Sequence, residues 1–326
     1  MQTEFARALR HGGLASRRDA LIGVAGLGMA AAMMPAPLLA NENRSRDRSR
    51  FDWDDPATNL SILSRMWGTI EPGEMATLYV FGPMFGMTGP DDFRPLFRME
   101  SIANVRTYPQ DGGAFRYLAN QIILFTDFDT GEVLETWANP YLDGEKVEVF
   151  HYRDGPLDYV LDPLKLPARY DIRTKGDLGR KLVLDWYFRG DEAYGDAIAR
   201  TRLKNKLDPK VWKRESIGEW WETAEAYRWN GKIAEIEDPS LPSIPSFTGD
   251  FQTFKPWEPF MLMGQRPGKI FSVRTAFKIA SYDIVPRPVM SYAEKHLPQF
   301  LDTPRVFDKS YKLNDAWFQE MRRPMP

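Results

Sequence analysis

Hydrophobic and polar residues alternate over much of residues 74–189, as they do in strands that bury one face. The alternation predicts strands over 75–82, 93–108, 115–125, 133–137, 146–152, 170–174 and 181–189. Residues 127–132 read DFDTGE, and their Asp, Thr and Gly favour a turn that joins 115–125 to 133–137 as a hairpin. Strands at short intervals without intervening helices indicate an antiparallel sandwich or barrel.

Helical spacing is confined to a few segments. The sequence predicts short helices over 59–67, 191–207, 292–300 and 314–321. Residues 215–229 fit both one face of a helix and one side of a strand, and their aromatic side chains favour the strand. A further strand is predicted over 269–279, after a Pro/Ser-rich connector at 238–248 that we expect to be extended.

The segment 256–268, PWEPFMLMGQRPG, combines apolar bulk with three prolines. Because proline cannot donate to a strand ladder, the segment is not a regular inner strand throughout. We expect it to close one end of a barrel, with Arg266 as a charge at a hydrophobic lip. A packed lid in which Arg266 forms a structural salt bridge is the alternative to a ligand clamp.

The N-terminal residues have the features of an export signal. Arg17 and Arg18 precede an apolar run at 21–34 and a stretch of small residues that ends at Ala40. This order is typical of a signal peptide, and the arginine pair indicates the twin-arginine route and its export machinery. A single membrane anchor is the alternative, but the run is short and glycine-rich, whereas a span needs about 20 apolar residues.

We therefore expect a signal at 1–40, a flexible polar tether at 41–58 and one β-rich periplasmic domain at 59–326. The predicted fold is mainly β: an antiparallel barrel-like or sandwich domain, lipocalin-like, with a few short helices. The formal net charge is −2, and no basic block follows the one at 44–50, so we expect no nucleic-acid partner. After cleavage of the signal, we expect no membrane partner either.

The chain contains no cysteine. This excludes thiol nucleophiles, iron–sulfur clusters and cysteine zinc sites. The two histidines outside the signal, His151 and His296, lack metal-ligand spacing, and no glycine-rich phosphate loop follows a predicted strand. We therefore expect neither a metal nor a cofactor.

Three blocks of the sequence carry a resemblance: 126–140, 214–220 and the 256–268 segment, which is the most specific. With these blocks the chain resembles a family of exported bacterial proteins known only by a domain-of-unknown-function label. The resemblance covers most of the chain after residue 40. It implies a single shared domain, often behind a twin-arginine signal, and it assigns no catalytic residue.

The candidate catalytic residues are therefore chosen by their chemistry. His151, which we expect on the apolar face of the 146–152 strand, titrates near neutral pH and is the candidate general base. Glu100, Arg266 and Tyr117 are the other candidate acid–base or charge-stabilising groups. The structural alternatives are a hydrogen-bonded core histidine and carboxylates held in salt bridges or facing solvent.

The candidate ligand-binding residues combine aromatic, thioether and polar side chains, as apolar ligand pockets do. They are Arg98, Trp137, Trp221, Trp257, Met261, Met263 and Gln265. Most aromatic residues of such a domain must be core, which is the structural alternative for each of them.

Three functions fit these observations. The first is an exported cofactor-independent enzyme, of the lyase or isomerase type, that acts on a hydrophobic or aromatic small molecule in a barrel-like cavity. The second is a lipocalin-like periplasmic binding or carrier protein with the same pocket and no turnover. The third is a structural protein of the cell envelope with a packed core. A pocket with a buried titratable group would favour the first function.

Overall fold

The computed structural model describes residues 51–89, 91–164, 171–174, 177–178, 182–303, 305–306 and 312–326. All of them belong to the unit Ser49–Pro326, whereas the expected signal and its cleavage site lie in the unit Met1–Arg48, outside the described residues. Within the described part, no helix is long and apolar enough to cross a bilayer. Phe51 and Trp53, which lie within the expected tether, pack against the core.

An 11-stranded antiparallel sheet dominates the described residues, in the order β6-β3-β2-β1-β13-β12-β11-β10-β7-β8, with β9 paired to β10. The strands of this sheet are β1 (Met75–Gly89), β2 (Asp92–Pro109), β3 (Phe115–Thr126), β6 (Tyr152–Leu161), β7 (Asp171–Thr174), β8 (Asp177–Leu178), β9 (Asp185–Arg189), β10 (Glu192–Lys204), β11 (Trp220–Lys232), β12 (Thr248–Lys255) and β13 (Lys269–Ile279). A small second sheet pairs β4 (Thr136–Asn139) with β5 (Glu145–Glu148). The mainly β prediction is confirmed, but β6 and β8 do not pair in the described residues, so the sheet is not closed into a barrel.

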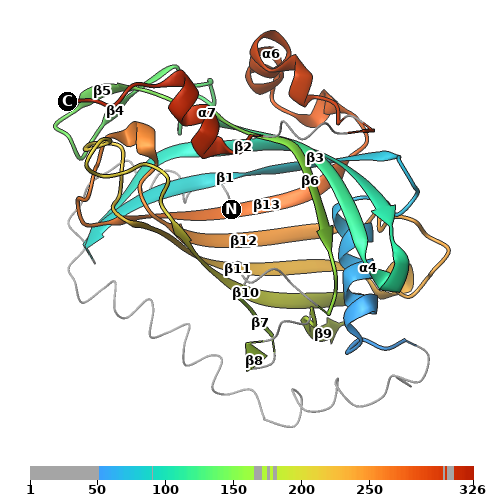
Figure 1. Cartoon of the computed structure of the whole chain (residues 1–326). Coiled ribbons are helices and arrows are strands. Elements are labelled where there is room, and N and C mark those ends of the chain that lie inside the picture. The colour runs from blue at the N-terminus through green and yellow to red at the C-terminus, as the bar shows by residue number, and fades with distance from the viewer. Residues whose placement is uncertain are drawn as a thin grey trace, which may run out of the picture. The chain divides into compact units, whose positions relative to one another are not determined.

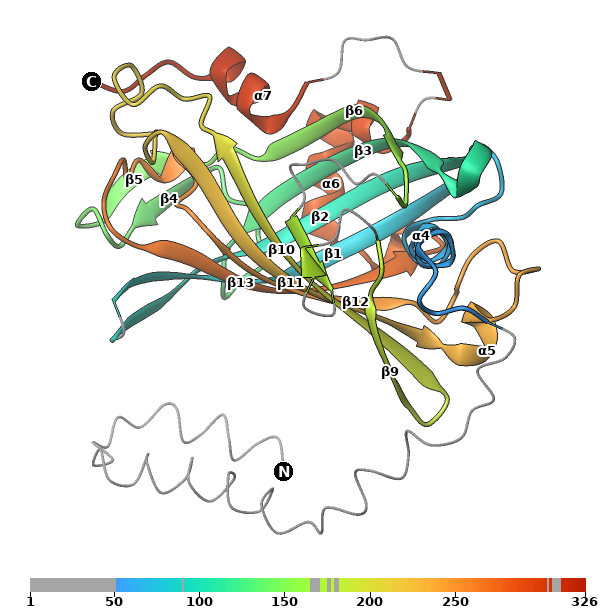
Figure 2. The same cartoon turned by 60° about the horizontal axis from the view of Figure 1, so that its bottom comes forward.

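Figures 1 and 2 show that the sheet is strongly curved. The helices are α4 (Pro56–Trp67), α5 (Ile233–Ile236), α6 (Arg287–His296) and α7 (Asn314–Met321). We call the face that packs against α4 the inner face, and the face that packs against α6 the outer face. The two views agree that α4 lies at one end of the strands, whereas α7, β4 and β5 lie at the other.

Strand alternation sorts the buried residues into three clusters. Towards α4, the inner face is filled by a cluster that includes Leu60, Tyr117 and Trp229. Towards α7, the inner face is filled by a second cluster, which includes most of the segment 257–263. The third cluster lies between the outer face and α6. The two inner clusters therefore occupy opposite ends of the same curved face.

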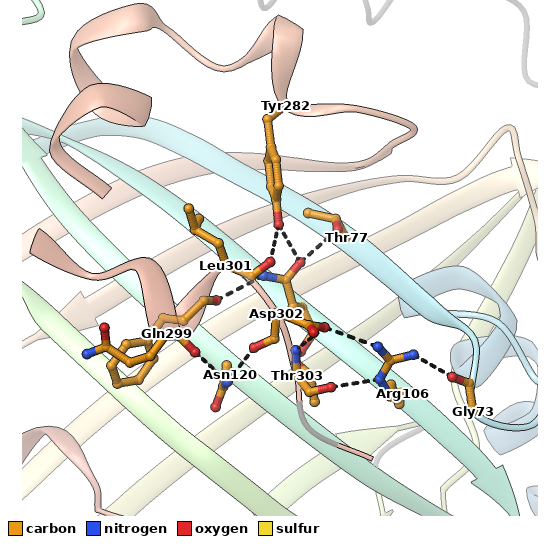
Figure 3. Close-up of polar contacts among 11 residues, drawn as sticks. Gly73, Thr77, Arg106, Asn120, Tyr282, Gln299, Leu301, Asp302 and Thr303 are labelled. Atoms are coloured by element: carbon orange, nitrogen blue, oxygen red, sulfur yellow. Dashed lines mark hydrogen bonds and ion pairs between the residues drawn. The ribbon is translucent and has the colours of Figure 1, made fainter. Parts of the chain in front are cut away.

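The chain after α6 is held on the outer face by side chains of the sheet (Figure 3). Asn104 Nδ2 donates to the carbonyl of Phe300 at 3.0 Å, and Arg106 Nε donates to the carbonyl of Thr303 at 2.7 Å. Both donors are buried side chains of β2. They satisfy carbonyl groups that the irregular segment cannot satisfy itself, which fixes residues 300–303 against the outer face.

The largest error of the sequence prediction concerns residues 191–207, where the structure has the strand β10 and not a helix. The alternate residues Ala193, Gly195 and Ala197 are small and face inward. A Cβ at Gly195 would lie 2.9 Å from the side chains of Leu184 and Trp186, so a larger residue does not fit. Pairing with β9 and β11 on either side overrides the helical propensity of the alanines.

The residues after β3 also differ from the prediction. The turn at 127–132 forms as expected, with a hydrogen bond of 2.8 Å from the Asp127 N–H to the Glu132 carbonyl. Its return pairing is limited to the Thr126–Val133 bridge and a bond from the Leu134 N–H, because β4 pairs with β5 and not with β3, so the hairpin is much shorter than expected. The expected strand 146–152 is divided between β5 and β6, and His151 lies in the link. By contrast, residues 220–232 form the favoured strand, with Trp221, Thr223 and Tyr227 on one side.

Residues 257–263 of the segment 256–268 are part of the inner core, whereas residues 265–267 are exposed. Trp257 is 1% exposed, and its Nε1–H donates to the carbonyl of Arg266 at 3.2 Å. Gly268 has a φ of +132°, and a Cβ there would lie 2.2 Å from the Trp257 ring. The glycine therefore lets the chain turn tightly over the indole. The expectation that this apolar segment packs down against one end of the sheet is confirmed.

Candidate functional site

A pocket of about 440 Å³ lies beside α7, and we call it the α7 pocket. It lies between β6 on one side and the ends of β10, β11 and β12 on the other. Its apolar wall consists of Ile123, Leu203, Trp221, Pro259, Leu313 and Phe318. Its titratable residues include Tyr152, Asp154, Lys255, Glu258 and Asp315. The volume suits a small organic molecule, and the mixed lining is typical of ligand pockets.

Asp154 reaches the pocket because of its place in β6. Tyr152 pairs with Ile123 and Asp154 with Gln121, and alternation puts both β6 side chains on the inner face. The Asp154 carboxylate accepts hydrogen bonds from the backbone N–H of Asn314 at 2.9 Å and from Asn314 Nδ2 at 3.0 Å. Asp154 therefore also anchors the first residue of α7.

Asp154 as a residue is partly exposed, but its carboxyl group is closely surrounded by protein atoms. This burial raises its pKa to about 6, against the effect of the Asn314 hydrogen bonds. The negative charge of Asp315 raises the pKa further. A carboxyl with this pKa exchanges a proton near neutral pH.

Glu258 lies within the segment 256–268, and its side chain is 1% exposed. It accepts a hydrogen bond from the Tyr152 hydroxyl and forms an ion pair with Lys255 Nζ. Burial, and then the charge of Glu258, hold the pKa of Tyr152 well above its usual range, so the phenol stays protonated. The three residues form a connected polar group in the pocket lining.

The C-terminal residues close this end of the pocket by contacts to both sides. Phe318 packs against Phe150, before β6, and against Trp212, after β10, with ring centroids 5.1 and 5.6 Å away. Gln319 Nε2 donates to the Lys206 carbonyl at 3.0 Å. Asp315, in the first turn of α7, lines the pocket, and burial raises its pKa. The helix α7 thus contacts both the β6 side and the β10 side of the pocket.

The four predicted catalytic residues are not brought together. Tyr117 lies at the α4 end of the inner face, where its hydroxyl is 2.6 Å from Ser64 Oγ and burial raises its pKa. Glu100 lies on the outer face, where it accepts a hydrogen bond from Tyr79 and burial raises its pKa. Arg266 is exposed. Neither these three nor His151 is among the described residues that line the α7 pocket.

His151 is buried in the link between β5 and β6. Its Nδ1 accepts a hydrogen bond from the backbone N–H of Phe125 at 3.1 Å, and its ring contacts Tyr292 of α6 at 4.9 Å. Burial lowers its pKa to about 4. These contacts are typical of a core histidine that is held by a hydrogen bond, which is the alternative to a general base.

Trp221 is the one predicted ligand-binding residue that lines the α7 pocket, within the described part of the chain. Trp257, Met261 and Met263 are buried in the second inner cluster, and Trp137 packs against it. Gln265 is exposed, and Arg98 is held over the Phe128 ring by a hydrogen bond of 2.9 Å from its Nε to the Phe128 carbonyl.

Five titratable residues of the pocket lining were not predicted from the sequence, namely Tyr152, Asp154, Lys255, Glu258 and Asp315. A signal for two of them was present, since the alternation through 152–154 puts both residues on one face. Glu258 was also visible as a carboxylate between two prolines of an apolar segment. Among the described residues, no group of three or more histidines and carboxylates is arranged to hold a metal ion.

A search of the curated proteins gave no match. A comparison with protein families matched residues 73–318, from the turn before β1 into α7, to the model of a family described as proteins of unknown function, DUF1838. The match covers every strand of both sheets and the residues around the α7 pocket. The chain therefore belongs to the DUF1838 family of proteins of unknown function.

Proposed function

We propose that this chain is an exported, cofactor-independent enzyme of the lyase or isomerase type. It binds an apolar or aromatic small molecule in the α7 pocket and moves a proton with Asp154. The observation that carries the proposal is the Asp154 carboxyl, surrounded by protein atoms in the wall of a 440 Å³ pocket. The proposed location is the periplasm, reached by the twin-arginine route.

The proposed reaction begins when ionised Asp154 takes a proton from a carbon of the ligand next to a carbonyl group. The electron pair of the broken C–H bond moves to the carbonyl oxygen, and the ammonium of Lys255 stabilises the negative charge there. Lys255 has three N–H donors and uses one on Glu258. Return of the proton from Asp154 to another carbon of the enolate gives an isomer. In the lyase reaction, the electron pair returns from the oxygen to form a C=C bond, and the bond to a group on the next carbon breaks, so that this group leaves with the bonding pair.

A lipocalin-like carrier is the second candidate. It is favoured by the two hydrogen bonds from Asn314, which occupy both oxygens of Asp154 and suit a purely structural carboxylate. The curved sheet, with a pocket on its inner face, fits either function. The two candidates differ only in whether the bound molecule is changed.

The test is to incubate the purified exported protein with an extract of its own periplasm and to follow molecular masses. An enzyme converts at least one compound, with an isomer detected by its changed chromatographic retention. A carrier retains a compound without changing it. If the protein neither converts nor retains any compound, the proposal is wrong in both forms.

The pH dependence of turnover is expected to follow Asp154. As a base, Asp154 must be ionised in the free enzyme, so kcat/KM should fall about tenfold per pH unit below pH 6 and be level above it. The measurement is a pH–rate profile of the conversion found in the extract. A profile that is flat from pH 5 to pH 7 would contradict the assignment.

A further inference from the structure

A second polar group lies on the inner face outside the α7 pocket. It consists of Glu225 and Tyr227 on β11, Thr253 on β12 and Arg274 on β13, and we call it the inner polar group. Arg274 Nη2 donates to Thr253 Oγ1, which in turn donates to Glu225 Oε1 at 3.2 Å. Arg274 Nη2 lies 3.7 Å from the same oxygen, and the Tyr227 hydroxyl donates to the other.

The inner polar group and the α7 pocket share one face of the same strands. Thr253 is two residues from Lys255 on β12, and Glu225 is four residues from Trp221 on β11. With a rise of about 3.4 Å per residue, the group lies roughly 7–14 Å from these two pocket residues. A ligand that enters the pocket can therefore reach the group if it is elongated.

The inner polar group keeps free hydrogen-bonding capacity. The side chains of Arg274 and Glu225 are 19% and 23% exposed, so solvent reaches this part of the inner face. The Arg274 guanidinium has five N–H donors, and its Nη2 uses one of them on Thr253. Arg274 Nε is buried without a partner among the described residues, so the donors left for a ligand are those of the Nη atoms. A carboxylate has about four acceptor positions, and the hydrogen bonds from Thr253 and Tyr227 use two of those on Glu225. Nη donors of Arg274 and about two acceptor positions of Glu225 thus remain within the same ion pair.

We propose that the ligand of the α7 pocket is an elongated apolar molecule with a hydroxyl group at its far end, held between Arg274 and Glu225. The inference rests on the proposed function, because it extends the ligand from that pocket. A hydroxyl accepts from the guanidinium and donates to the carboxylate. A terminal carboxylate would face the like charge of Glu225, and a terminal ammonium would face that of Arg274.

The test compares three probes with the same chain, namely 1-decanol, decanoic acid and decylamine. Each is titrated at pH 7.5 into the exported protein, and binding is followed by calorimetry. The alcohol is expected to bind at least about tenfold more tightly than either charged probe. Equal affinities for the three probes would overturn the inference without any need for a variant.

Two charge-removing variants then test the roles of the residues. Glu225→Gln is expected to raise the affinity for decanoic acid about tenfold relative to that for 1-decanol. Arg274→Gln should raise the affinity for decylamine by the same factor. Arg228→Gln, on the same sheet but in an exposed pair with Asp196, should leave the order of affinities unchanged. If both inner variants change all three affinities alike, their role is only structural and the inference is wrong.

A variant of the pocket separates this inference from the proposed function. Trp221→Ala should weaken the binding of all three probes, because it removes part of the apolar wall of the α7 pocket. Binding that needs Trp221 but shows no preference for the alcohol overturns the inference alone. Binding that is indifferent to Trp221→Ala counts against both the inference and the α7 pocket.

Discussion

Replacing Asp154 by asparagine is expected to lower turnover by about 10²–10⁴-fold while ligand affinity changes little. The amide cannot take a proton, yet it keeps the size of the side chain. Its oxygen can still accept the hydrogen bond from the Asn314 backbone, so α7 remains anchored. The measurement is kcat on the conversion found in the extract, together with the dissociation constant from calorimetry.

Asp158→Asn is the matched control, because Asp158 is on the same strand but forms an exposed ion pair with Arg116. It should leave kcat within about twofold, since exposed pairs contribute little. A fall in kcat that is equal for both variants would point to damage to β6 rather than to lost proton transfer. Full activity of Asp154→Asn would show that another group is the base.

The parts of the fold that follow local rules were predictable. The alternation gave β2, β3 and β13 nearly to the residue, and proline with apolar bulk marked 256–268 as packed but irregular. In β10, small residues at alternate positions carried the period of a strand, but alanine favours helices, and the deciding contacts come from β9 and β11. Closure of the sheet depends on whether its two edge strands, β6 and β8, pair with each other. The local alternation of residues gives no information about that pairing.

The site was less predictable, because it depends on contacts between distant segments. The pKa of Asp154 is set by burial beside α7, 160 residues later in the chain. The choice of His151 rested on the ordinary pKa of histidine, which burial at the actual position changes. Trp221 was chosen for its aromatic side chain, and the structure places it in the pocket lining, on the strand face that also carries Thr223 and Tyr227.

The α4 end of the inner face depends on one buried cation. Arg65 is 3% exposed, and its guanidinium donates to the carbonyls of Ile236 and Asp238, the latter at 2.8 Å. Ile236 is the last residue of α5, so its carbonyl has no partner within that helix. Burial lowers the pKa of Arg65, but the group remains charged because its reference value is so high. Arg65 therefore caps α5 and ties it to α4.

Replacing Arg65 by methionine is expected to destabilise the domain by about 3–5 kcal/mol, because it leaves buried carbonyl groups without donors. For a domain of this size, Tm should fall on the order of 10 °C. The measurement is denaturant unfolding together with calorimetry. Arg116→Met is the control, since its exposed pair with Asp158 contributes at most about 1 kcal/mol. If the two variants lose equal stability, Arg65 does not hold the α4 end together. Its buried hydrogen bonds would then contribute no more to the free energy of unfolding than the exposed Arg116–Asp158 ion pair does.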